Sequence, residues 1–238
     1  MSLLPKFKTL GKVLLEQIRL LLYGPPKIGK TTLASGFSNA IFLATEKGYE
    51  SIKIFKTDIK KWEDFQDVSD ELLKGKHNFK TVVVDTGDIL WSHCVDYMCE
   101  KMDIEHPSDE DWGKGYAMIR SEFEREINKL FMSDLGLIII SHTKEVEIKN
   151  KMSAITKTVP TLPNQARNIL IPKVSLIGYM GVETVKVGEK QYREQRFLSF
   201  APSEILEAGD RDGKLPLKFT VFKDPLKTYK VFEEAYAK

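Results

Sequence analysis

The chain has 238 residues, of which 36 are basic and 34 acidic, giving a formal net charge of +2. This near balance excludes a globally basic or acidic surface, so any surface for nucleic acid must be local. A hydrophobic fraction of 42% and a charged fraction of 29% suit one α/β domain with a sizeable core.

Cysteine usage and hydropathy bear on the compartment. Cys94 and Cys99 have no histidine at zinc spacing, so we expect reduced cysteines rather than a disulfide framework. The N-terminal residues lack the apolar core of a signal peptide, and no segment approaches the roughly 20 apolar residues of a membrane span. We therefore expect a cytoplasmic protein with no membrane partner.

The first predicted elements are a strand over residues 18–23 and a helix that starts at residues 31–37. Between them, residues 24–31 read Gly-Pro-Pro-Lys-Ile-Gly-Lys-Thr, which is the P-loop pattern. In such a loop the backbone N–H groups surround phosphate, the lysine reaches the β- and γ-phosphates, and the threonine holds Mg²⁺. The alternative is a glycine-rich turn without nucleotide. The residues predicted to bind the nucleotide are Gly24, Pro25, Pro26, Lys27, Ile28, Gly29, Lys30, Thr31 and Thr32.

An acidic residue follows the second predicted strand. That strand covers residues 41–44, and Glu46 comes two positions after it. Ligands of open α/β sheets bind at the carboxyl ends of the strands, which would place Glu46 near the γ-phosphate as a catalytic base. The alternative is a solvated loop acid. A short strand over residues 51–55 and a helix within 58–74 come next.

Two further strands also end in polar side chains. Residues 81–85 are predicted to form a buried strand that ends in Asp85, and we expect this carboxylate to bind Mg²⁺ together with the P-loop threonine. Alternatively, Asp85 only caps the following turn. A helical stripe over residues 116–130 precedes the strand 135–140, which leads into Ser141-His142. We expect His142 to lie beside the γ-phosphate and to sense hydrolysis, or else only to cap its strand.

Alternation of strands and helices predicts the fold class. Continuous β-branched runs are typical of a parallel sheet covered on both faces, and right-handed crossovers then give a doubly wound α/β fold. Residues 144–167 are polar, rich in Lys and Thr, and predict a long functional loop. Strand-like runs at 174–180, 181–187, 192–201 and 216–222 predict antiparallel strands at the sheet edge. Residues 229–238 form a short helix or a tail.

The order of these features resembles the RecA-like P-loop ATPases, in particular the phage nucleotide-binding family that includes the Sak-group single-strand annealing proteins. The resemblance covers about residues 18–180 and is carried by the P-loop and by residues 43–48, 112–116 and 140–145, with Ala44 in place of the usual acid. It implies a RecA-like fold, ATP and Mg²⁺ as ligands, Glu46 as the catalytic base, and the host cytoplasm if the protein is phage-encoded.

We accordingly divide the chain into three parts. Residues 1–17 form an N-terminal extension, and residues 18–225 form the RecA-like ATPase domain. This domain includes the loop at 144–167 and a C-terminal β extension at 174–222. Residues 226–238 form a C-terminal tail.

The resemblance also implies partners. In RecA-like proteins the loop after the sensor strand contacts single-stranded DNA, and cations on a flexible loop suit backbone phosphates. The acidic residues Glu145 and Glu147 reduce the positive charge of this loop, so the alternative is that the loop only connects two elements and binds no DNA.

The resulting hypothesis for the whole protein is an ATPase acting on single-stranded DNA in recombination, annealing or replication. Its alternative is a nucleotide-dependent switch that recruits a replication partner. The predicted DNA contacts are Lys149, Lys151, Lys157 and Arg167.

A charged turn adds a last candidate. Arg211 and Lys214 lie on a glycine-flanked turn, and RecA-like ATPases commonly complete their site with a basic finger from a neighbouring subunit. The resemblance therefore implies a homo-oligomer in which Arg211 acts in trans as a catalytic residue. The alternative is a hairpin turn that is merely charged.

Overall fold

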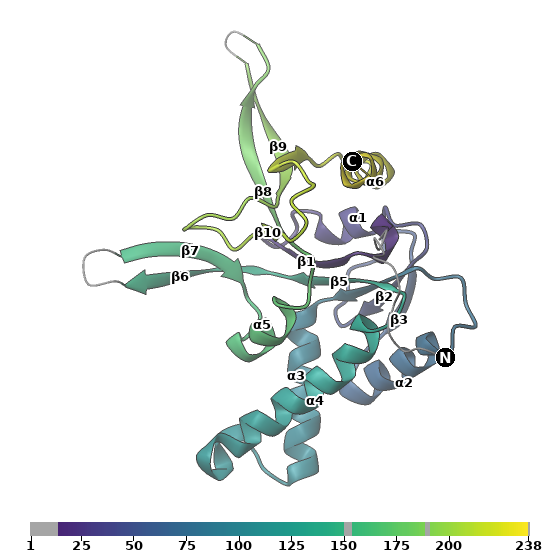
Figure 1. The fold of residues 1–238 in the computed structure, drawn as a ribbon, viewed down its shortest axis with the longest axis vertical. Coiled ribbons are helices and arrows are strands. Elements are labelled where there is room, and N and C mark those ends of the chain that lie inside the picture. The colour runs from purple at the N-terminus through teal and green to yellow at the C-terminus, as the bar shows by residue number, and fades with distance from the viewer. Residues whose placement is uncertain (1–13, 150–153, 189–190, 238) are drawn as a thin grey trace, which may run out of the picture.

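The computed structural model describes residues 14–149, 154–188 and 191–237. Five neighbouring strands of its main sheet run parallel (Figure 1), and they lie in the order β1-β5-β4-β2-β3, with β3 at the edge. Their bounds are β1 (Arg19–Tyr23), β2 (Ala40–Ala44), β3 (Phe55–Asp58), β4 (Thr81–Asp85) and β5 (Gly136–Ser141).

The C-terminal strands extend this sheet on the other side of β1. Strand β8 (Leu176–Lys186) runs parallel to β1, and β9 (Tyr192–Ser199) pairs antiparallel with β8. The short strands β10 (Gly209–Asp210) and β11 (Lys218–Thr220) pair antiparallel with β8 and β9 respectively. The predicted α/β fold, with a mostly parallel sheet and antiparallel strands toward the C-terminus, is confirmed.

Helices cover both faces of the sheet (Figure 1). On one face lie α2 (Trp62–Leu73), α3 (Gly87–Met102), α4 (Lys114–Phe131) and α5 (Asn164–Leu170). On the other face lie α1 (Lys30–Ala34) and α6 (Pro225–Tyr236). Short 3₁₀ turns occur at Leu15–Gln17, Pro107–Asp109 and Asp111–Gly113.

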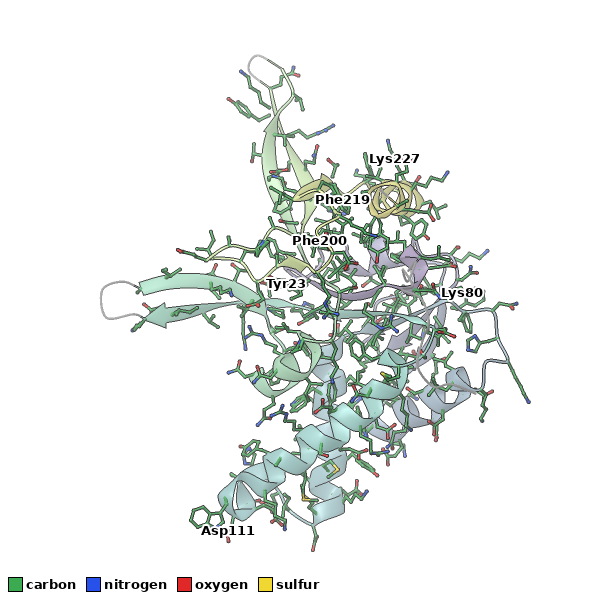
Figure 2. The ribbon with its side chains drawn as sticks, viewed as in Figure 1. Tyr23, Lys80, Asp111, Phe200, Phe219 and Lys227 are labelled. Carbon is green, nitrogen blue, oxygen red and sulfur yellow. The ribbon has the colours of Figure 1, made fainter. Side chains whose placement is uncertain are left out.

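The two-residue period of the strands divides the core into two hydrophobic clusters. Val82 and Val84 pack with α2–α5, whereas Val83 packs with α1 and α6. Because both faces are covered, the central strands carry consecutive apolar residues through their middle positions, as the continuous β-branched runs predict. Phe200 and Phe219 lie between the sheet and α6 (Figure 2).

Three segments differ from the sequence predictions. Residues 144–167 are not a long loop: β6 (Thr143–Lys149) and β7 (Ala154–Pro160) form an antiparallel hairpin that leads into α5. The two strands expected at 174–187 are one strand, β8. The C-terminal part, named a tail at 226–238 with a short helix left open for 229–238, is largely helix α6, whose Phe232 is only 1% exposed.

Smaller shifts occur at the edges. Strand β3 begins at the last residue of the run expected at 51–55. Within the predicted N-terminal extension, Leu15 is buried, while residues 1–13 lie outside the described residues. Cys94 and Cys99 are buried free thiols. None of the described helices is both long enough and apolar enough to cross a bilayer.

The end of β1 is held by a tyrosine, which gives a first prediction. The Tyr23 hydroxyl donates to the backbone oxygens of Glu207 at 2.6 Å and Thr158 at 3.3 Å, and burial raises the pKa of this phenol. Tyr23→Phe leaves a carbonyl without its donor, so we expect the free energy of unfolding to fall by about 1–3 kcal/mol in urea titrations. Tyr192→Phe, at an exposed position, is the control. Equal stability of the two variants would contradict this role.

Candidate nucleotide site

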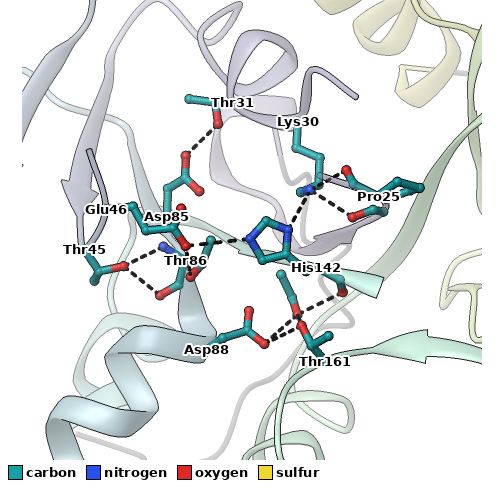
Figure 3. A network of polar contacts seen from close by, with 12 residues as sticks. Pro25, Lys30, Thr31, Thr45, Glu46, Asp85, Thr86, Asp88, His142 and Thr161 are labelled. Carbon is teal, nitrogen blue, oxygen red and sulfur yellow. Dashed lines mark hydrogen bonds and ion pairs between the residues drawn. The ribbon is translucent and has the colours of Figure 1, made fainter. Parts of the chain in front are cut away.

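The topology of the parallel strands assembles the candidate site. The P-loop follows β1, Glu46 follows β2, Asp85 ends β4, and His142 follows β5. All four strands run parallel, so their carboxyl ends lie at one edge of the sheet. Figure 3 shows the side chains from these four positions converging on one space.

The backbone of the P-loop depends on its glycines. A Cβ at Gly24 would lie 2.3 Å from the backbone oxygen of Met180 on β8, so no larger residue fits there. Gly29 has φ 105° and Lys27 has φ 61°, both in the left-handed region that turns the chain into α1. The loop therefore folds back on itself at the end of β1, which is the shape a phosphate cradle requires.

Lys30 is held inside this loop. Its side chain is largely buried, and Nζ donates to the backbone oxygens of Gly24 and Pro25, each at 2.9 Å. Burial lowers the pKa of Lys30, and the carboxylate of Asp85 opposes that shift. The ammonium is therefore positioned within the space that the loop encloses.

Thr31 and Asp85 form the second part of the site. The Thr31 hydroxyl donates to Oδ2 of Asp85 at 2.7 Å. Burial raises the pKa of the Asp85 carboxyl, while the hydrogen bond from Thr31 lowers it. A hydroxyl and a carboxylate side by side are hard oxygen donors of the kind that bind Mg²⁺ together with phosphate oxygens. The two predicted metal residues therefore fit the ion.

His142 lies between Lys30 and Glu46. Its Nδ1 is 3.4 Å from Nζ of Lys30, and its Nε2 is 3.7 Å from Oε1 of Glu46. Because an ammonium can only donate, Nδ1 is the acceptor in the contact with Lys30, while Nε2 faces Glu46. Glu46 also accepts from the Thr86 hydroxyl at 3.2 Å. The sequence predicts all three side chains at the site, and the structure brings them together.

Sequence reasoning missed a second polar group next to the site. Asp88, in the first turn of α3, accepts hydrogen bonds from Thr161 at 2.6 Å and Ser141 at 3.2 Å (Figure 3). These contacts join the end of β5 to the residue that follows β7. Asp88 and Thr161 are 73 positions apart, so spacing gives no signal for their pairing.

Arg211 and Lys214 are not brought to the P-loop of their own chain. Nη2 of Arg211 donates to the backbone oxygens of Pro172 at 2.6 Å and Val174 at 2.8 Å, beyond the amino end of β8. Lys214 lies 5.9 Å from the ring centroid of Tyr236. Action of Arg211 on a neighbouring subunit stays a prediction, and it would require the guanidinium to leave both carbonyls.

The predicted DNA contacts gather around the β6–β7 hairpin, but acids already pair with them. Lys149 lies 3.1 Å from Glu147, and Glu207 lies 2.8 Å from Lys157 and 3.4 Å from Arg167. Lys151 lies outside the described residues.

A model of a family described as an AAA domain matches residues 16–211, which is most of the chain. The chain belongs to this AAA-domain family. The prediction of a nucleotide-binding P-loop ATPase domain is thereby confirmed at the level of the family, whereas membership of the Sak group stays a prediction. No curated protein matches this AAA-domain chain.

Among solved structures, the AAA-domain chain is similar to a KaiC-like protein from the hyperthermophilic archaeon Pyrococcus horikoshii OT3. The two sequences are 12% identical, the match covers 89% of this chain and 88% of the other, and the TM-score is 0.49.

Proposed function

We propose that this AAA-domain protein hydrolyses ATP in a Mg²⁺-dependent reaction at the P-loop and couples the reaction to single-stranded DNA through the β6–β7 hairpin. The observation that supports hydrolysis is the convergence of Lys30, Thr31, Asp85, His142 and Glu46 at one edge of the sheet. Nucleotide binding alone needs only Lys30, Thr31 and Asp85. The carboxylate of Glu46 and the imidazole of His142 face the same space and add a catalytic base and a sensor of the γ-phosphate.

Each residue then has a defined task. Lys30 exchanges its two carbonyl partners for phosphate oxygens, with little loss of hydrogen bonding. Thr31 and Asp85 would hold Mg²⁺, which supplies charge neutralisation at the phosphates when it is bound. Glu46 orients the attacking water and takes its proton, and the hydrogen bond from Thr86 fixes the orientation of the carboxylate.

The route from the site to the hairpin is also short. His142 follows β5 directly and precedes β6. Asp88 holds Ser141 on one side of this junction and Thr161, just after β7, on the other. A shift of His142 on loss of the γ-phosphate would therefore move both ends of the hairpin. A homo-oligomer and a replication or recombination protein as a further partner belong to the same proposal.

The alternative function, a nucleotide-dependent switch, is favoured by the ion pairs of the hairpin, because they reduce the charge left for DNA. Phosphate release from ATP, measured with and without Mg²⁺ and single-stranded DNA, separates the two. An ATPase acting on DNA accelerates when oligonucleotide is added, and a switch does not. Absence of any release in the presence of Mg²⁺ would contradict the proposed hydrolysis.

Salt dependence tests the DNA surface itself. Contacts to phosphate release counterions, so affinity for single strands should fall steeply with salt. Replacing Lys149, Lys151 and Lys157 by Gln should flatten the slope by up to about three contacts. The control replaces Lys74, Lys76 and Lys80, three exposed lysines near the amino end of β4, and leaves the slope unchanged. Equal slopes for the two triple variants would move the DNA site off the hairpin.

A further inference from the structure

A basic cleft borders the P-loop. It has a volume of about 1110 Å³, and its walls come from P-loop residues 25–28, from β8 and β9, and from the segment that leads into α6. Five cations and one carboxylate line it. These charged residues are Lys27, Arg193, Glu194, Arg196, Lys223 and Lys227.

Arg196 approaches the P-loop from β9. It lies on β9, where its backbone oxygen accepts from Val221 at 2.9 Å, so its position is fixed by the sheet. A Cβ on Gly29 would lie only 3.0 Å from Nη1 of Arg196. The absence of a side chain at Gly29 thus leaves room for the guanidinium against the loop.

The electrostatics of this guanidinium are unbalanced. Within the described residues, Arg196 forms no ion pair, and the surrounding cleft adds four more cations. A partly buried cation among like charges is unfavourable until an anion joins it. A guanidinium presents paired N–H donors in a planar fork that matches phosphate oxygens.

We propose that Arg196 binds the phosphate chain of the nucleotide held by the P-loop of its own subunit, which makes the basic cleft a second wall of the phosphate site. This inference rests on the proposed function. His142 approaches the P-loop from β5, one neighbour of β1, and Arg196 approaches it from beyond β8, the other neighbour. The phosphates would therefore lie between His142 on one side and the guanidinium of Arg196 on the other. Among the described residues, the guanidinium of Arg196 has no ion-pair partner, whereas that of Arg211 is bonded to two carbonyls.

Nucleotide titrations test the assignment. Arg196→Ala should weaken ATP and tripolyphosphate binding about 10- to 100-fold, as expected for loss of a charged hydrogen bond. It should also reduce the salt dependence of both affinities. Arg196→Lys keeps the charge and should recover part of the affinity. Arg120→Ala, which removes an exposed guanidinium from α4, should bind like the wild type.

Three results would overturn the inference. The first is unchanged ATP affinity of a folded Arg196→Ala protein while Lys30→Ala loses binding; the proposed function would then stand without Arg196. The second is an equal loss in the Ala and Lys variants with unchanged salt dependence, which would show that Arg196 only shapes the loop. The third is recovery of turnover on mixing Arg196→Ala with Lys30→Ala protein, which would place Arg196 in trans. Wild-type protein that binds no ATP would instead refute the proposed function.

Discussion

Replacing Lys30 by Ala should lower ATP turnover at least about 100-fold, because the substitution removes the one buried ammonium of the P-loop from the β- and γ-phosphates. The loss should affect both nucleotide affinity and rate. Phosphate release and ATP titration on the same preparation measure the two effects.

The fold should survive this change. In the part of the chain that the structure describes, the hydrogen bonds of Lys30 Nζ join it to two backbone oxygens and to His142, and burial in the loop already disfavours its charge. Circular dichroism and the melting temperature of Lys30→Ala should therefore match the wild type. Lys80→Ala is the matched control, because Lys80 is exposed and lies at the amino end of β4, away from the P-loop. Normal turnover by a folded Lys30→Ala protein would refute the P-loop assignment.

Glu46→Gln should separate binding from hydrolysis. The amide keeps the size of the side chain and can still accept from Thr86, but it cannot take a proton from water. We expect hydrolysis to slow about 100-fold or more, the scale of a positioned general base, with ATP affinity nearly unchanged. Single-turnover measurements with labelled ATP report the hydrolytic step.

Glu50→Gln is the control, since Glu50 is an exposed acid four positions further along. It should hydrolyse ATP at the wild-type rate. If Glu46→Gln does the same, the base lies elsewhere, and Glu46 is the solvated loop acid that the sequence left open. Asp85→Asn should behave differently from both, because loss of a metal-binding carboxylate weakens Mg²⁺ dependence and nucleotide binding together.

The sequence predicts the site residues that directly follow or end a buried parallel strand. The P-loop, the acid after β2 and the carboxylate that ends β4 each adjoin a buried apolar strand. Parallel strands necessarily bring such positions to one edge. The general rule for parallel sheets therefore predicts that Lys30, Glu46, Asp85 and His142 lie together.

The hairpin at β6 and β7 was missed for a physical reason. A two-stranded ribbon that leaves the body of the molecule is hydrated on both faces, so it needs no continuous apolar run. Its signal was the alternation of polar residues with Val146 and Ile148, which the many Lys and Thr residues concealed.

Contacts that depend on how the C-terminal strands pair with β8 are not predicted from the sequence. Arg211 bonds to Pro172 and Val174 because β10 pairs with the amino end of β8. Arg196 reaches the P-loop because β9 pairs with β8 beyond the end of β1. Neither pairing follows from the spacing of residues along the chain.

The most direct test is a crystal structure of the Glu46→Gln protein with ATP and Mg²⁺. We expect Lys30 to leave the oxygens of Gly24 and Pro25 and bind phosphate, Thr31 and Asp85 to hold the metal, and the γ-phosphate to face His142 and residue 46. A nucleotide bound away from the P-loop, or a γ-phosphate remote from residue 46, would contradict this expectation.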